Sequence, residues 1–419
     1  GRLPRTYAVN YLSAVAGSLV PDTRWFPNDH LSTRLAAAQI AEVPAYLKRA
    51  VSTAFPADAS LRVGSVTVAD SLATVDLSGT FSPDSKLRRG VWTQLAATLL
   101  RLPDVYRVTV QVDGSVLDFP GRPTSNGSTL ADLGADGERA PAGLPVFRTG
   151  STLRQVDLAA SGGLTTVAPD SGAQKSLPSI DPTWHDLAVS RNATEVAGID
   201  PARTVVGRWV GGHEYEVPLT ATLIGRPAYD VRGWLWLPAV GARAEDRLWA
   251  VDTAADPADA SAAKARPIEV PWLSGRVVTA ISLPLDGQRV AVISTDGAGR
   301  GARLDVAGVV RDQAGRPASL AAPLRLGPQL DRAIDVSWTD ETAVAALGVA
   351  GTGQAVVPLV ASLGGDVAMQ SPVTAPTSIG TTGGARDLVV TTSSGRVLAR
   401  SGTVWSELGK GTDFTVPAD

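Results

Sequence analysis

The stretch ISLPLDGQRVAVI, residues 281–293, alternates large apolar residues with smaller or polar ones on both sides of a proline and an Asp-Gly pair. Alternation with period two predicts a strand with one buried face, and an Asp-Gly pair suits the positive φ angles of a tight turn. Gly287 tolerates a left-handed backbone, and Pro284 lies at the end of the first strand, where it removes no ladder hydrogen bond. The stretch therefore predicts a β-hairpin.

The same order of strand, polar turn and strand recurs through the second part of the chain. The copies are VSRNATEVAGI (189–199), YDVRGWLWL (229–237), VSWTDETAVAAL (336–347) and GTTGGARDLVVTTSSGRVL (380–398). Hairpins spaced roughly 40 to 55 residues apart are typical of propeller blades. We therefore predict an all-β propeller of about six blades over residues 146–419, with five or seven blades and a β-sandwich as the alternatives. The strands near PVFRTGSTLRQVDL (145–158) would supply the first blade or the closure of the ring.

Residues 1–120 carry helical as well as strand patterns and predict an α+β domain with helices on one face of a mostly antiparallel sheet. Strands are expected at 7–12 and 18–26, a helical pair at 30–43 and 44–55, and a hairpin at 61–78. Val91, Leu95 and Leu99 continue a row of apolar residues from Leu87, which predicts an amphipathic helix capped by Ser82 or Asp84. A second hairpin turns at Asp113-Gly114.

Between these zones, GRPTSNGSTLADLGADGERAPAGLP (121–145) is rich in Gly, Pro, Ser and Asp and shows little periodicity. Such a composition is typical of a linker. We therefore expect a multidomain chain, with an α+β domain at 1–120, a linker at 121–145 and a β-propeller at 146–419. The length of 419 residues fits more than one core.

Composition excludes several classes of partner and of chemical site. The formal net charge is −3 and there are no long basic runs, so the chain lacks the basic footprint of a nucleic-acid-binding protein. The absence of Cys excludes disulfides, thiolate metal sites and a Cys nucleophile. No apolar run in these residues approaches the roughly 18 to 20 residues that cross a bilayer, and the residues from Gly1 onward lack the charged-then-apolar pattern of a signal peptide. We expect a targeting segment upstream of Gly1.

Two stretches could carry chemistry. His185 lies beside Asp181 and Asp186, a combination that can bind a metal or move a proton, but we favour a turn in which the carboxylates bond backbone amides. DGAGRGARL (296–304) has spaced glycines that could cradle a phosphate. Because no helix follows to supply N-terminal amides, we favour a hairpin tip.

Other signs of catalysis are weak. No Gly-x-Ser-x-Gly stretch is present, and a serine triad would have to recruit one of three scattered His. A carboxylate pair of the glycosidase kind stays open, but Asp70, Asp230, Asp286 and Asp340 lie beside expected turns, where Asp usually caps backbone amides. We therefore predict a protein that is not an enzyme, without catalytic, cofactor-binding or metal-binding residues and without a cofactor.

Aromatic residues could mark a binding surface. Arg24, Trp25 and Phe26 combine residue types that are enriched in binding hot spots, although we expect burial under the helices. Trp234 and Trp236 alternate on one face of a strand, which favours packing between blades. The residues that contact a partner are unknown at this point.

LVPDTRWF, SVTVADSLATVDLSGTF and LRRGVWTQLAATLLRLPDVYRVTVQVDG, in that order, resemble the GerMN domain of bacterial envelope proteins, which has no known catalytic constellation. The apolar-Gly-Pro ending that usually follows the first helices is replaced here by RAVSTAFP. The chain as a whole is similar to the actinobacterial lipoprotein LpqB family, and the similarity covers nearly all of it. It rests on these three stretches together with LSGRVVTAISLPLDGQRVAVISTDGAGRGARLDVAGVVRD, GWLWLPAV and DVSWTDETAVAALG.

The resemblance implies a signal peptide, a lipidated Cys and a further N-terminal region upstream of Gly1. It implies a lipoprotein held by that lipid on the outer face of the cytoplasmic membrane. It also implies a protein partner, the extracytoplasmic domain of the sensor histidine kinase of an MtrA-MtrB type two-component system. A propeller hydrolase such as a lactonase or glycosidase, and a binder of glycan or peptidoglycan, remain the alternative functions.

Overall fold

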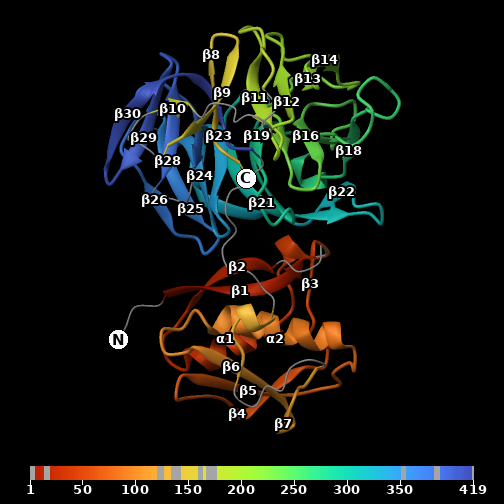
Figure 1. Cartoon of the computed structure of the whole chain (residues 1–419), viewed down its shortest axis with the longest axis vertical. Helices are drawn as coiled ribbons and strands as arrows, with labels where there is room; N and C mark the ends of the chain where they lie inside the picture. The colour runs from red at the N-terminus through yellow and green to blue at the C-terminus, as the bar shows by residue number, and fades with distance from the viewer. Residues whose placement is uncertain are drawn as a thin grey trace. The chain divides into compact units, whose positions relative to one another are not determined.

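The structure is a computed structural model that describes residues 5–13, 19–119, 127–133, 143–158, 164–166, 177–350, 355–381 and 387–417. The chain divides into two compact units, Gly1–Arg139 and Ala140–Asp419 (Figure 1). Of the expected linker 121–145, only 127–133 and 143–145 lie within the described residues. Ser128 bridges to Val108 and Leu133 is buried, so 127–133 packs on the first unit. A role of 121–145 as a linker stays a prediction.

The first unit is the expected α+β domain. In chain order its elements are β1 (Arg5–Ser13), β2 (Leu19–Phe26), α1 (Leu31–Ile40), η1 (Ala45–Leu47), β3 (Val51–Ser52), β4 (Ser60–Ala69), β5 (Leu72–Ser78), α2 (Ser85–Leu99), β6 (Arg107–Val112), β7 (Ser115–Val116) and η2 (Ala131–Leu133). They form two sheets among the described residues, where the sequence predicted one, and the orders are β2-β1-β3 and β4-β5-β6-β7. Helix α2 connects β5 to β6, and this pair of strands is parallel.

Local sequence explains most of these elements. Asp70 and Ser71 both have positive φ, as do Asp113 and Gly114, which matches the tight turns predicted for the two hairpins. The side chain of Asp84 accepts a hydrogen bond from the backbone N–H of Lys86 at 2.7 Å, so Asp84 is the cap of α2.

The row of apolar residues on α2 is largely buried. Val91, Leu95 and Leu99 are at most 1% exposed, which confirms the face that the periodicity predicted. Leu87, in the first turn, is 41% exposed. The buried face therefore begins one turn later than the sequence pattern.

The prediction of a second helix over 44–55 is wrong. Only a short 3₁₀ turn forms at Ala45–Leu47, and Arg49 has a φ of 68°, which no α-helix accommodates. Val51 and Ser52 instead pair with β1 as strand β3. The segment gains sheet hydrogen bonds there, which outweigh its helical propensity.

A polar network is buried between β1 and the two helices. Gln39 of α1 and Gln94 of α2 are both fully buried, and their side-chain amides donate to the backbone oxygen of Asn10 at 2.7 and 2.9 Å. Gln39 Oε1 accepts in turn from the Asn10 N–H and the Thr98 hydroxyl. Because the buried polar atoms have partners, the network fixes how the helices lie on the sheet.

The second unit consists of four-stranded antiparallel sheets, here called blades and numbered 1 to 6. Blade 1 contains β8 (Val146–Thr149), β9 (Thr152–Asp157), β10 (Thr165–Thr166) and β31 (Thr412–Thr415), and blade 2 contains β11 (His185–Val189), β12 (Glu195–Ile199), β13 (Val206–Val210) and β14 (His213–Glu216). Blade 3 contains β15 (Ala228–Tyr229), β16 (Trp234–Pro238), β17 (Leu248–Asp252) and β18 (Arg266–Ile268).

Blades 4 and 5 share the long strand β23 (Leu324–Asp340), which pairs with β21 through its first part and with β24 through its second. Blade 4 adds β19 (Val277–Ser282), β20 (Arg289–Thr295) and β21 (Ala302–Arg311), and blade 5 adds β24 (Ala343–Ala350), β25 (Val357–Ser362) and β26 (Val367–Met369). The short elements η3 (Pro271–Leu273) and β22 (Pro317–Leu320) accompany blade 4. Blade 6 contains β27 (Pro376–Thr381), β28 (Leu388–Thr392), β29 (Arg396–Ser401) and β30 (Val404–Lys410).

The described part of the chain therefore builds a propeller of six blades, as the recurring hairpin predicted. Each hairpin copy connects the first two strands of one blade, from β11–β12 in blade 2 to β27–β28 in blade 6. Strand β31 pairs with β8, so the end of the chain completes blade 1 and closes the ring. The stretch 145–158 thus contributes to both the first blade and the closure.

The core lies between neighbouring blades. Trp236 of blade 3 clusters with Val290 and Val292 of blade 4, and Phe147 of blade 1 clusters with Val389 of blade 6. Trp236 is fully buried and Trp234 packs against the same cluster, which confirms their predicted role in blade packing. None of the helices in the described residues is long and apolar enough to cross a bilayer.

Candidate functional site in the propeller channel

The innermost strands of the blades surround a central channel, and one side chain crosses it. Arg226 lies just before β15, and its backbone N–H donates to the carbonyl of Thr279 on β19 at 3.1 Å. The preceding residue, Gly225, makes this approach possible. A Cβ at that position would lie 2.8 Å from the carbonyl oxygen of Val278 and 2.9 Å from Cβ of Pro238.

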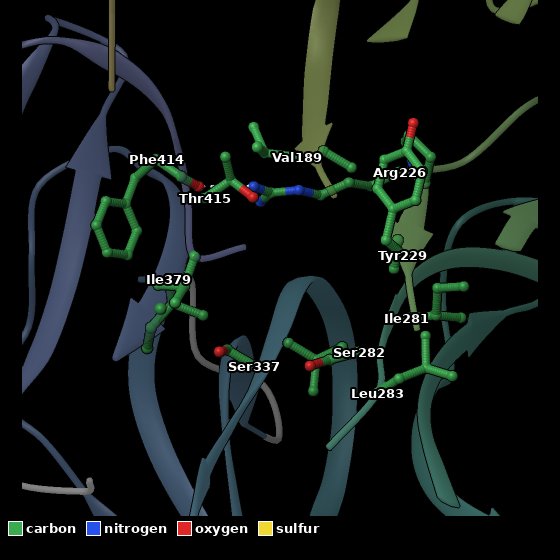
Figure 2. A pocket seen from close by; sticks show the side chains of 16 residues that line it. Val189, Arg226, Tyr229, Ile281, Ser282, Leu283, Ser337, Ile379, Phe414 and Thr415 are labelled. Carbon is green, nitrogen blue, oxygen red and sulfur yellow. Dashed lines mark hydrogen bonds between the residues drawn. The ribbon is translucent and has the colours of Figure 1, made fainter. Parts of the chain in front are cut away.

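The guanidinium of Arg226 joins three other blades, and Figure 2 shows it beside Phe414 and Thr415 of β31. Its Nη1 donates to Oδ2 of Asp335 on β23 at 2.6 Å, and its Nη2 donates to the carbonyl of Phe414 on β31 at 2.8 Å. Asp335 Oδ2 also accepts from the backbone N–H of Ile379 on β27 at 2.9 Å. Arg226 therefore connects blade 3 with blades 5 and 1 directly, and with blade 6 through Asp335.

This ion pair is buried, because the side chains of Arg226 and Asp335 are only 16% and 3% exposed. Burial raises the pKa of Asp335, and the charge of Arg226 opposes that rise without cancelling it. Burial alone would lower the pKa of Arg226, but the carboxylates of Asp335, Asp186 and Asp413 raise it, which keeps the guanidinium charged. A buried pair of this kind is costly to break by removing one partner.

The space beside Arg226 is small. The cavity has a volume of about 70 Å³ and is lined by β11, β15, β19, β23, β27 and β31 and their flanking residues. Ligand sites for drug-sized molecules are roughly 300 to 1,000 Å³, and a water molecule occupies about 30 Å³ of liquid. This channel cavity therefore fits a few water molecules or a small ion.

Two of the polar side chains at the channel, those of Ser282 and Tyr229, hold neighbouring blades together. Figure 2 shows Ser282, Ser337 and Tyr229 around the cavity. Ser282 Oγ accepts from the backbone N–H of Trp338 at 3.2 Å, and the Tyr229 hydroxyl donates to Oε1 of Glu195 at 2.6 Å. Burial raises the pKa of Tyr229 well above its ordinary value, and the Glu195 charge adds to the rise, so this hydroxyl remains a donor.

Further buried arginines join neighbouring blades. Arg208 donates to both carboxylate oxygens of Glu195, at 2.6 and 2.8 Å, and reaches the carbonyl of Thr253 in the next blade. Arg311 of blade 4 donates to Oδ2 of Asp230 in blade 3 at 2.7 Å.

In blade 4, Arg289 pairs with Asp286, and its guanidinium lies 4.7 Å from the ring centroid of Trp338 in blade 5. The sequence suggested backbone caps for Asp230 and Asp286, and the structure confirms them. Asp230 Oδ1 accepts from the N–H groups of Arg232 and Trp234, and Asp286 Oδ1 accepts from that of Gln288. No local pattern predicted the ion pairs that the same carboxylates form.

Asp181 and Asp186, the two carboxylates near His185, have different partners in the structure. Asp181 caps its own turn, because its Oδ1 accepts from the N–H and the hydroxyl of Thr183, as predicted. Asp186 binds side chains instead, so the prediction of a backbone cap is wrong for this residue: its Oδ2 contacts Nδ1 of His185 at 3.1 Å and accepts from Arg203 at 2.6 Å. No cluster of three His, Cys, Asp or Glu with the geometry of a metal site occurs in the described residues.

The charge of Asp186 is strongly favoured. Burial raises its pKa, but the hydrogen bond from His185 and the positive charges of Arg226 and Arg203 outweigh this and lower it to about 2. Asp186 therefore stays ionised and contributes to the electrostatic environment of Arg226.

Other sequence candidates are placed as follows. Asp340 caps Thr342, whose N–H donates to Asp340 Oδ1 at 2.7 Å, and Asp70 lies in the β4–β5 turn. Residues 296–301 of the stretch 296–304 form the turn between β20 and β21, as predicted, and Asp296 Oδ1 accepts from the N–H of Arg300. The expected burial of Trp25 is wrong, since it is 48% exposed on the edge strand β2.

Sequence reasoning missed Arg226. The only local signal was the Gly-Arg-Pro run at 225–227, in which a small residue and a proline flank a cation. Its partners lie 109 and 188 residues away in the chain, so no local pattern could connect them.

Comparisons with known proteins agree with this architecture. A sequence model described as "Lipoprotein LpqB beta-propeller domain" matches residues 162–418, and one described as "Sporulation and spore germination" matches residues 7–118. The chain is 26% identical over 398 residues to "Lipoprotein LpqB" of Thermobifida fusca (strain YX), covering 83% of this chain and 60% of that protein. The chain thus spans 60% of the length of this curated relative.

Among solved structures, the chain is similar to one titled "Crystal structure of Nidogen/Laminin Complex", with 12% identity, a TM-score of 0.44 and coverage of 65% of this chain and 98% of that one. It is also similar to "Crystal structure of TolB from Acinetobacter baumannii", with 16% identity, a TM-score of 0.43 and coverage of 65% and 66%. Because the propeller model matches more than half of the sequence, the chain belongs to the family of LpqB lipoproteins with a β-propeller domain.

Proposed function

We propose that this protein is a non-enzymatic lipoprotein of the bacterial cell envelope that binds a protein partner and modulates the extracytoplasmic part of a two-component sensor kinase of the MtrA-MtrB type. The observation that carries the non-enzymatic part is the channel, where Arg226 and Asp335 form a buried ion pair across the space in which a propeller enzyme would hold its substrate. Family membership and the name of the relative from Thermobifida fusca support the envelope location.

The chemistry of the channel supports binding rather than turnover. A general acid, base or nucleophile must reach the substrate, and the substrate needs space beside it. The polar groups named above instead contact one another or the backbone, and the cavity of about 70 Å³ is too small for a sugar or a lactone with its leaving group. The channel acts as the centre of a rigid scaffold.

A rigid scaffold can regulate a sensor without chemistry. A binding protein shifts a two-state partner only by its difference in affinity for the two states, and a difference of about 1 to 3 kcal/mol changes signalling roughly five- to 150-fold. A lipid anchor would hold the protein beside the membrane and raise its effective concentration near the sensor. Weak binding is then sufficient.

The test is the kinase activity of the reconstituted sensor in three conditions, with the lipid-anchored protein, with the soluble chain and without either. We expect the anchored protein to change autophosphorylation several-fold and the soluble chain to have the same effect only at higher concentration. Equal activity in all three conditions, with no measurable binding, would refute the regulatory function. Binding of the soluble chain to isolated peptidoglycan would then favour the glycan-binding alternative.

Trp25 offers a first contact to test, because an exposed aromatic on an edge strand is typical of a binding hot spot. Trp25→Ala should weaken binding to the sensor domain at least about tenfold if this strand contacts it. Tyr106, which is 67% exposed before β6, is the matched control in the same unit. Equal losses for Trp25→Ala and Tyr106→Ala, or no loss for either, would exclude β2 as the specific contact.

A further inference from the structure

A second cavity lies at one end of blade 4, away from the channel. It has a volume of about 390 Å³ and its lining includes three arginines, Arg276, Arg303 and Arg325. We call it the arginine pocket. Its walls come from the residue before β19, the turn between β20 and β21, and the start of β23. The volume falls within the roughly 300 to 1,000 Å³ of small-molecule sites.

Arg276 forms a fixed wall of this pocket. Its Nε donates to Oγ of Ser294 at 2.8 Å, and its Nη2 donates to the carbonyls of Ser294 and Gly301 at 2.7 and 2.8 Å. The buried Arg247 holds the backbone, since its Nε donates to the carbonyl of Arg276 at 2.6 Å. These bonds fix the guanidinium across the ends of β20 and β21 before any ligand binds.

The other two arginines keep donors available. Arg325 uses its Nε for Asp305 Oδ1 at 2.6 Å, is 52% exposed, and leaves its terminal nitrogens without a partner among the described residues. The side chain of Arg303 is exposed on β21 and forms no hydrogen bond or ion pair within the described part of the chain. Both side chains line the pocket and come from different strands.

An irregular stretch of β23 opens the space for them. Leu304 of β21 pairs with Leu326 of β23, and Ala302 pairs with Leu330. The two pairs are two residues apart on β21 but four residues apart on β23, so β23 bulges between them. Gly327 has a φ of 70° in this bulge and lines the pocket. The bulge therefore interrupts the ladder opposite Arg303 and leaves room where a regular strand would lie.

The charges in the pocket are not balanced. Three guanidinium groups line the pocket with one carboxylate, that of Asp296, and the carboxylate of Asp305 accepts from Arg325 Nε. Asp296 Oδ1 already accepts from the N–H groups of Ala298 and Arg300. Burial lowers the pKa of Arg276, and repulsion from Arg303 and Arg325 lowers it further. An anion placed between the arginines would relieve this repulsion.

We propose that the arginine pocket binds a phosphate group carried by a small molecule or a headgroup. The planar guanidinium matches phosphate oxygens, and a tetrahedral phosphate offers oxygens to arginines that approach from different strands. A carboxylate lies in one plane and suits a single fork, so the arrangement favours phosphate. The glycine-containing turn at 296–304 contributes part of the wall, without the helix that a phosphate loop requires.

The test is direct binding to the full chain at low ionic strength, where such contacts are strongest. Calorimetry with glycerol 3-phosphate, and glycerol as the neutral control, measures a soluble phosphate ester. Co-sedimentation with phosphatidylglycerol vesicles, and phosphatidylcholine vesicles as the control, measures a lipid headgroup. Binding in the first assay identifies a soluble source, and binding only in the second identifies a lipid.

Arg303→Gln removes a charge that has no described partner, so the fold should be preserved, as unchanged thermal unfolding would verify. It should weaken phosphate binding about tenfold. Arg154→Gln is the matched control, because Arg154 is also exposed on the third strand of a blade and has no described partner. This control should bind like the wild type.

Three outcomes would overturn the proposal. They are no binding of either phosphate probe, equal binding by the wild type and Arg303→Gln, and binding of a glutamate-rich peptide where the phosphate probes fail. The last result would identify an acidic protein partner instead. Because these assays use no kinase, their result is independent of the proposed signalling function.

Discussion

Removing the Arg226 guanidinium tests whether the channel ion pair holds the propeller closed. Arg226→Met keeps much of the side-chain volume but removes the hydrogen bonds to Asp335 and to the Phe414 carbonyl. It leaves a carboxylate that is 3% exposed without its cation. Breaking a buried pair in this way costs about 3 to 5 kcal/mol, which corresponds to a fall in Tm on the order of 10 °C.

The matched control is a surface pair in the same unit. Arg396 Nε lies 2.8 Å from Oε2 of Glu407, and the two side chains are 50% and 40% exposed. Arg396→Met should therefore cost less than about 1 kcal/mol, because water screens and solvates exposed charges. The two ion pairs have similar lengths but differ in exposure, so a difference in unfolding free energy between the two variants reports the effect of burial.

Asp335→Asn completes a double-mutant cycle. The asparagine oxygen can still accept from the Ile379 N–H, so Arg226→Met combined with Asp335→Asn should be more stable than the sum of the single changes predicts, by at least about 1 kcal/mol. The pKa of Asp335 is already raised in the folded protein, so its ionised form disfavours folding once Arg226 is gone. The deficit of Arg226→Met should therefore shrink as the pH is lowered and Asp335 takes up a proton.

Urea unfolding followed by tryptophan fluorescence measures these free energies, with the slope against urea concentration checked for each variant. Most of the Trp residues lie in the propeller, so the signal reports mainly on that unit. A loss below about 1 kcal/mol for Arg226→Met, or strict additivity in the cycle, would show that the pair does not stabilise the closed ring.

Three further changes test the channel and its closure. In the folded protein the pKa of Asp186 is about 2, below its ordinary value of 3.8, so its charge stabilises the fold above pH 4. This contribution of about 2 kcal/mol is lost as the pH falls towards 2, and the unfolding free energy of Asp186→Asn should therefore fall less with acid than that of the wild type. Gly225→Ala should lower the free energy of unfolding in urea by about 1 to 3 kcal/mol, because the new Cβ would lie 2.8 Å from a backbone oxygen. Gly297→Ala is the control, because its Cβ would meet no atom within 4 Å, and its free energy of unfolding should change by less than about 0.5 kcal/mol. Phe414→Ala removes a side chain that is 1% exposed from the closing strand and should cost about 3 to 5 kcal/mol, with faster limited proteolysis of the C-terminal strand; wild-type proteolysis rates would contradict a role in closure.

Much of the fold follows from local sequence. Alternation and turn residues located the hairpin of every blade from 2 to 6, because a period of two and a tight turn are properties of adjacent residues. The same holds for α2, whose cap at Asp84 and buried face were legible in the sequence. The helix predicted over 44–55 failed where a strand partner, Leu12–Ser13 on β1, decided the outcome.

The candidate sites depend on tertiary contacts, which no local sequence pattern predicts. The turns at Asp230 and Asp286 were predicted, but the same carboxylates also bind arginines, and Asp230 does so across a blade boundary. No sequence pattern marks Gln39 and Gln94, yet both are buried and donate to the backbone of β1. Polar side chains acquire such roles only when packing excludes water around them.

The sequence by itself determined the class of each unit, the repeated hairpin, the approximate number of blades and the family. Only the tertiary structure decided that β31 closes the ring on β8, that Arg226 crosses the channel to Asp335, and that Arg303 and Arg325 line one pocket. Strands and turns are set by interactions among neighbouring residues, which a sequence pattern records. A channel or a pocket is set by which distant strands meet, and that depends on the free energy of closing the whole ring.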